Sequence, residues 1–174
     1  MGVVKLTKAD ILRLFHLLDA ELGAVGAEGE VYLVGGAVMC LVLNARESTK
    51  HIDAFFKPTK VLREASARVA ARANVPDNWL NDAVKRYLSP RGEFAAYLEL
   101  QHLRVFVAKP EYLLAMKCAS MRLGEEFHDL DDIRYLLRYL NIENPEDAMA
   151  IVRQYYDDSH LLPKTRLALD ELLS

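Results

Sequence analysis

The sequence predicts an α+β fold, with a small mixed sheet, flanking helices and a helical C-terminal part. An apolar, β-branched run at Val31–Val34 is typical of a buried strand, and a second short run, Ile52–Phe56, follows a pair of glycines. Helical periodicity dominates before the first run, and only helical patterns follow Val107. The expected organisation is an α/β core over residues 1–109 and a helical part over residues 110–174, packed together or forming one continuous domain.

Composition excludes several classes of protein. The 174 residues include 52% hydrophobic and 27% charged side chains, which are ordinary globular values. A net charge of -3 provides no general attraction to nucleic acid, so any RNA contact requires a local basic patch. No apolar run has membrane-spanning length and the N-terminus lacks a signal-peptide pattern, so we expect a cytoplasmic protein with no membrane partner. Cys40 and Cys118 lie in apolar contexts and are expected to be small buried hydrophobes.

The first helix is expected to be scaffold. Thr7 and Asp10 have the spacing of a capping box, and Gly23, Gly26 and Gly29 follow the helix. The apolar positions after the cap share one helical face: Ile11, Leu14, Phe15, Leu18 and Leu22.

The stretch from Val31 to Phe56 carries the candidate site. Gly35 and Gly36 end the first strand, and an apolar helix is expected over residues 37–46. Two glycines let the backbone approach a ligand closely, and helix N–H groups attract an anion such as a phosphate. Thr49, His51 and Asp53 alternate along the second strand and are therefore expected to project together toward the glycine turn.

At these residues the chain resembles the minimal nucleotidyltransferase fold, which is polymerase-β-like, and in particular the AbiEii/AbiGii-type abortive-infection toxins. The resemblance consists of the strand, the Gly-Gly pair, the helix and the pattern R-x-S-T-K-x-I-D that ends at Asp53. It extends from about Val31 to Leu140. Members of that family carry Asp-x-Asp on the second strand to hold catalytic Mg²⁺. Asp53 matches the second aspartate, and His51 stands at the first.

The resemblance implies a toxin of a toxin-antitoxin or phage-defence system, which transfers a nucleotide from ATP or another nucleoside triphosphate to an RNA acceptor. It implies Mg²⁺ as cofactor, the tRNA acceptor stem as a possible acceptor, and a cognate antitoxin as partner. Asp53 would hold the metal, while Lys117 and the Gly35 and Gly36 amides would bind the phosphates. Thr49 would hydrogen-bond a phosphate oxygen or orient the site, and Asp132 would position Lys117 or serve the acceptor.

His51 leaves three explanations open, because imidazole is a poor ligand for Mg²⁺ and removes a negative charge. The chain is a naturally silent member, a variant altered because the active toxin kills its host, or a divergent enzyme that uses another metal. We favour a recently altered, impaired enzyme. The alternative is a catalytically silent protein that binds a nucleotide or a partner on the same fold.

Further expectations concern the middle of the chain. Pro58 should end the second strand, and a helix should follow over Val61–Ala73. Its arginines, Arg63, Arg68 and Arg72, are either solvated or face RNA. A further helix is expected from Asn78, burying Trp79, Leu80, Val84 and Leu88. Tyr97–Leu100 and Leu103–Val107 should form a hairpin, in which Glu99 is an exposed strand residue or a third site carboxylate.

The C-terminal part should consist of helices that begin at Pro110, Pro145 and Pro163, together with one that carries the acidic run Asp129–Asp132. A turn at Gly124 should return the chain so that Asp132 faces Lys117. Asp129 matches the first aspartate of a family Asp-x-x-Asp pattern, but we favour a helix cap. Tyr155 and Tyr156 are expected to pack within the fold, with stacking on a base as the alternative.

Overall fold

The computed structural model describes residues 5–120 and 129–174, so the predicted turn at Gly124 lies outside the described residues. The chain separates into two compact units. The first contains the chain up to Arg86 and Phe94–Val107. The second contains Tyr87–Glu93 and Ala108–Ser174, so the segment 87–93 belongs with the C-terminal helices.

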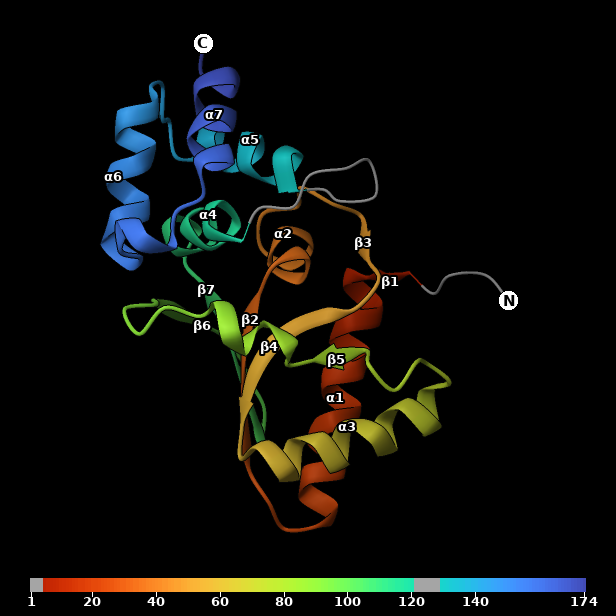
Figure 1. The fold of residues 1–174 in the computed structure, drawn as a ribbon. Coiled ribbons are helices and arrows are strands. Elements are labelled where there is room, and N and C mark those ends of the chain that lie inside the picture. The colour runs from red at the N-terminus through yellow and green to blue at the C-terminus, as the bar shows by residue number, and fades with distance from the viewer. Residues whose placement is uncertain (1–4, 121–128) are drawn as a thin grey trace. The chain divides into compact units, whose positions relative to one another are not determined.

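The first unit is built on a mixed sheet of five strands in the order β5-β4-β2-β7-β6 (Figure 1). The central strand β2 is antiparallel to β4 and parallel to β7, while β4 is parallel to β5. The chain is therefore an α+β protein with a mixed sheet, as the sequence predicts. The bounds of these strands are β2 Gly29–Val34, β4 Ile52–Lys57, β5 Leu80–Asn81, β6 Phe94–Glu99 and β7 Leu103–Ala108.

Helices α1 (Lys8–Ala24) and α3 (Thr59–Ala73) lie against the sheet and contact each other (Figure 1). The predicted capping box is confirmed, because the Asp10 N–H donates to Thr7 Oγ1 and the Thr7 N–H donates to the Asp10 carboxylate. Glu21 of α1 accepts hydrogen bonds from Arg68 and Arg72 of α3, at 2.9 and 2.7 Å. The α3 arginines thus pair with carboxylates of their own unit, since Arg63 likewise pairs with Asp82 at 2.9 Å.

The helix predicted over residues 37–46 is shorter than expected. Helix α2 covers only Gly36–Leu41, and Asn44 has a positive φ of 54°. The chain must reverse here, because β3 (Ser48–Thr49) pairs with β1 (Leu6–Thr7) before β4 begins. A helix of six residues has a weak dipole, so the anion attraction expected from it is largely lost.

The prediction of a helix from Asn78 is wrong. Leu80 and Asn81 form β5 beside Ile52 and Asp53, and only a short 3-10 helix, Ala83–Tyr87, follows. The buried Trp79 holds this segment in place, because its indole N–H donates to the Ser66 carbonyl at 2.9 Å. Trp79 and Leu80 are buried as predicted, whereas Val84 and Leu88 are only half-buried.

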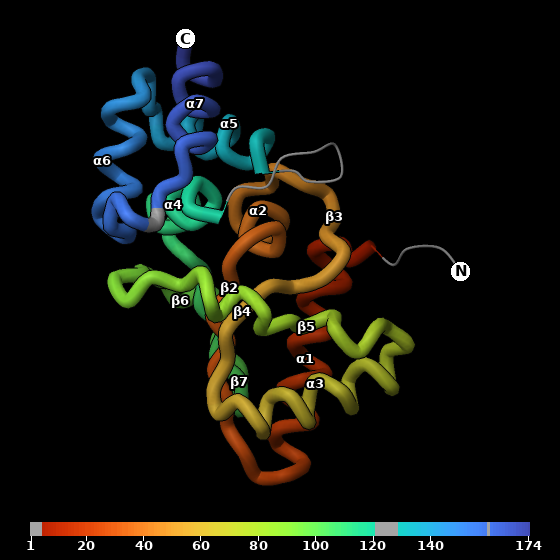
Figure 2. The backbone as a smooth tube through the Cα atoms, viewed as in Figure 1, coloured from red at the N-terminus to blue at the C-terminus, as the bar shows by residue number. Residues whose placement is uncertain are grey.

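The second unit contains α4 (Pro110–Ala119), α5 (Asp129–Tyr139), α6 (Pro145–Tyr155) and α7 (Pro163–Leu172), which Figure 2 traces as a tube. Proline occupies the first turn of α4, α6 and α7, as predicted. Tyr155 and Tyr156 are core residues, because both are buried and their hydroxyls donate to Glu93 and to the Tyr87 carbonyl. Stacking of these two rings on a base is therefore excluded in this arrangement.

Two further expectations concern cysteines and membranes. Cys40 and Cys118 are buried free thiols, and burial raises the pKa of Cys118 to about 12. Within residues 5–120 and 129–174, no helix has the length and apolar character needed to cross a bilayer.

Candidate functional site

The glycine turn between β2 and α2 forms the centre of the candidate site in the first unit. Gly35 has a φ of 70°, a conformation that side-chain-bearing residues rarely adopt. A Cβ atom at Gly35 would lie 3.3 Å from Oδ2 of Asp53. The antiparallel register explains this approach, because Asp53 pairs directly with Val34. The predicted proximity of Asp53 to the glycine turn is therefore confirmed.

Gly36 is covered by two polar side chains. A Cβ atom at Gly36 would lie 2.7 Å from Nη1 of Arg46 and 3.0 Å from Oγ1 of Thr49. Arg46 also lines a hollow of about 430 Å³ together with Lys8, Cys40 and other residues that flank the start of α1. We expected no role for Arg46 from the sequence, although it is the first residue of the R-x-S-T-K-x-I-D pattern. Nη1 of Arg46 is the atom nearest to that Cβ position, so the guanidinium brings a positive charge to the glycine turn.

Thr49, His51 and Asp53 lie close together, although not on one continuous strand. Thr49 belongs to β3, and β4 begins only at Ile52. The Thr49 hydroxyl donates to the His51 carbonyl at 3.1 Å and so holds the connection between the two strands. Nε2 of His51 lies 3.2 Å from Oδ1 of Asp53, with 41% and 35% of the two side chains exposed. Both groups are thus accessible to a ligand at the turn.

These residues do not fit a catalytic Mg²⁺ ion. Magnesium prefers several oxygen ligands in octahedral geometry, and the turn offers the carboxylate of Asp53 beside an imidazole. Across the described ranges, no group of three or more His, Cys, Asp or Glu side chains is placed to hold a metal. The expected metal site requires a second carboxylate beside Asp53, and the imidazole of His51 lies there instead.

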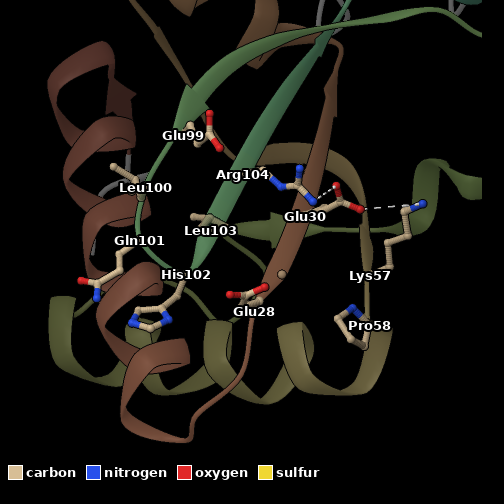
Figure 3. A pocket seen from close by; sticks show the side chains of 11 residues that line it. Glu28, Glu30, Lys57, Pro58, Glu99, Leu100, Gln101, His102, Leu103 and Arg104 are labelled. Carbon is tan, nitrogen blue, oxygen red and sulfur yellow. Dashed lines mark ion pairs between the residues drawn. The ribbon is translucent and has the colours of Figure 1, made fainter.

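Glu99 cannot serve as a third carboxylate at the turn. It lines a hollow of about 510 Å³ that includes Gly29 at the start of β2 (Figure 3). The Glu30 carboxylate in this hollow pairs with Arg104 at 3.1 Å and Lys57 at 3.9 Å. Because β2 runs from Gly29 to Val34, roughly 17 Å of strand separates this hollow from the row of Asp53. Glu99 is an exposed strand residue here, as we favoured.

A second polar cluster lies inside the second unit. The Lys117 ammonium on α4 lies 2.8 Å from Oδ2 of Asp132 and 3.1 Å from Oδ1 of Asp129, both on α5. All three side chains are buried. The predicted contact between Lys117 and Asp132 is confirmed, whereas Asp129 contributes an ion pair rather than only a cap. The ammonium is thus already paired with two carboxylates.

The structure therefore brings the sequence-predicted residues together in two groups. Gly35, Gly36, Thr49, His51 and Asp53 share the turn in the first unit. Lys117 and Asp132 share the buried cluster in the second unit, joined by Asp129.

Comparisons with protein-family models, with curated proteins and with solved structures found no match for this chain.

Proposed function

We propose that this chain is a nucleotide-binding protein of the nucleotidyltransferase type, whose turn at Gly35 and Gly36 receives the phosphates of a nucleoside triphosphate. The packing of Asp53, Arg46 and Thr49 against the two glycines carries this proposal. A side chain at either position would fill the space that these groups approach. Backbone that carries no Cβ atom lets a phosphate approach closely, and the Arg46 guanidinium provides charged donors suited to its oxygens, while the Thr49 hydroxyl holds the connection to β4.

Arg46 takes the main charge-neutralising role in this proposal. The guanidinium is permanently charged and forms bidentate hydrogen bonds with phosphate. The Lys117 ammonium lies within 3.1 Å of two carboxylates, Asp129 and Asp132, which already neutralise its charge. A role for Lys117 in phosphate binding requires that Asp129 or Asp132 first release it.

The transfer reaction is expected to be impaired in this sequence, because His51 occupies the place of a carboxylate. The proposed reaction of the unimpaired site is transfer of a nucleotide to RNA, with the tRNA acceptor stem as a candidate acceptor, in a toxin held in check by an antitoxin. The resemblance of residues 31–140 supports this part of the proposal. The second candidate, a catalytically silent binding protein, is favoured by the poor fit of the turn to Mg²⁺.

Nucleotide binding tests the first step. Calorimetry with ATP and the other nucleoside triphosphates should detect binding to the protein in the presence of a chelator, because the turn lacks a metal-binding pair. Arg46→Gln should weaken this binding roughly 10-fold or more, since it removes a charged hydrogen-bonding partner. Arg63→Gln, which removes an arginine paired with Asp82, is the matched control. Equal binding by Arg46→Gln and the unmodified protein would refute the phosphate site at Gly36.

Label transfer decides between the two candidates. The protein and its His51→Asp variant are incubated with each labelled nucleoside triphosphate, Mg²⁺ and total cellular RNA. Label that enters RNA only with His51→Asp supports an impaired transferase. Nucleotide binding by both proteins without label transfer by either supports the silent binding protein.

A further inference from the structure

We infer that the solvent-facing side of α5 binds single-stranded RNA through Arg134, Tyr135, Arg138 and Tyr139. This inference rests on the proposed function, because it gives the RNA acceptor a surface on the second unit. The two arginines and the two tyrosines are each four residues apart, so they share one side of the helix. The opposite side of α5 is buried through Asp129, Asp132, Ile133, Leu136 and Leu137.

Tyr139 presents aromatic surface to solvent beside the half-buried ring of Tyr135. The ring centroids of Tyr135 and Tyr139 are 6.4 Å apart, and their planes differ by 17°. Tyr139 is 53% exposed, so much of its large ring is open to solvent. Two nearly parallel rings provide faces on which unpaired bases can stack, whatever the sequence of the RNA.

Carboxylates neutralise the two arginines only weakly. Arg138 is exposed and forms no ion pair among the residues that the structure describes, and Arg134 approaches Asp131 only to 3.7 Å. By contrast, most other cations of the unit lie within 3.4 Å of a carboxylate: Arg91, Lys109, Lys117, Arg153 and Arg166. Positive charge is therefore available beside the tyrosines, although the chain as a whole carries a net charge of -3.

The combination of arginines and tyrosines on this side of α5 favours single-stranded RNA over other anionic partners. Alternating arginine and aromatic side chains match a strand in which phosphates alternate with unstacked bases. An acidic protein segment would use the arginines but would gain little from two exposed ring faces. A double helix would hide its base faces from the tyrosines.

The test measures binding of a labelled, mixed-sequence single-stranded oligoribonucleotide to the full chain by fluorescence polarisation at several salt concentrations. The variant Arg134→Gln/Arg138→Gln should bind roughly 10-fold more weakly, and its salt slope should fall by about 1.4, the value for two lost phosphate contacts. The control Arg153→Gln/Arg166→Gln removes the same charge from arginines paired with Asp158 and Asp170. This control should bind like the unmodified protein.

The aromatic contribution is tested with Tyr139→Leu, which is exposed enough to leave the fold intact. It should weaken RNA binding about 5-fold or more, but leave binding of an abasic oligomer of equal length unchanged. The inference would be overturned if the unmodified protein bound no RNA. It would also be overturned if the two double arginine variants lost equal RNA affinity, or if Tyr139→Leu lost as much affinity for the abasic oligomer as for RNA. ATP binding, measured on the same variants, should not change. A protein that binds RNA through α5 but binds no nucleotide would contradict the proposed function instead.

Discussion

Nε2 of His51 lies 3.2 Å from Oδ1 of Asp53, beside a glycine turn that Asp53 itself approaches. The imidazole thus contacts the one carboxylate that the resemblance assigns to a metal. A carboxylate at position 51 would stand next to Asp53 and would repel it unless a cation bound between them.

We therefore predict that His51→Asp converts the turn into a metal site. Without metal, the melting temperature should fall slightly because two carboxylates repel each other, and Mg²⁺ should restore it by binding to the folded state. The melting temperature of the unmodified protein should not respond to Mg²⁺. Differential scanning fluorimetry with and without Mg²⁺ measures both effects. His51→Asn, which removes the imidazole without adding charge, is the control, and a Mg²⁺ response equal to that of His51→Asp would contradict the prediction.

The two glycines should respond differently to alanine. Gly35→Ala places a side chain at a φ of 70° and should lower the free energy of unfolding by about 1–2 kcal/mol. Gly36→Ala meets the flexible end of Arg46, which can move away, so its stability should change by less than about 1 kcal/mol. Nucleotide binding should nevertheless weaken in Gly36→Ala, because Arg46 and Thr49 lose their positions. Urea unfolding and calorimetry of both variants provide the comparison, and a reversed order of stability would refute it.

Removal of Lys117 should destabilise the second unit strongly. Lys117→Met removes the ammonium that lies within 3.1 Å of the two buried carboxylates, Asp129 and Asp132, and loss of one partner of a buried ion pair typically costs about 3–5 kcal/mol. Adding Asp129→Asn and Asp132→Asn to this variant should recover much of the loss, because the two carboxylate charges that faced the ammonium are then removed as well. Urea unfolding of the single and triple variants tests this. A mild effect of Lys117→Met would show that the ammonium does not stabilise the cluster.

Acid should weaken the link between α1 and α3. Hydrogen bonds from Arg72 and then Arg68 lower the pKa of Glu21. A carboxylate whose pKa is lower in the folded state stabilises the protein above its unfolded pKa and loses this contribution as the pH falls through the folded value. Between about pH 5 and pH 3, the unmodified protein should therefore lose about 1 kcal/mol that Glu21→Gln does not lose. Urea unfolding at several pH values measures the difference, and parallel pH profiles would contradict it.

Local signals in the sequence determined many elements of this protein. The capping box at Thr7 and Asp10 marks α1, and prolines mark the starts of α4, α6 and α7. Pro58 follows directly after the end of β4. These predictions held because each depends on residues only a few positions apart, whose backbone geometry and hydrogen bonds are decided locally.

Tertiary structure alone decided the remaining features, because they depend on contacts between distant segments. Residues from Asn78 resemble a capped helix, yet pairing of Leu80 with Ile52 and burial of Trp79 favour a strand. Arg46 has no local signal for a role, and only the fold places its guanidinium against Gly36. The sequence by itself therefore indicated the glycine turn and the histidine at position 51, two residues before Asp53. The partners of Lys117, Arg46 and Glu21 became apparent only when the fold joined charges that lie far apart in the chain.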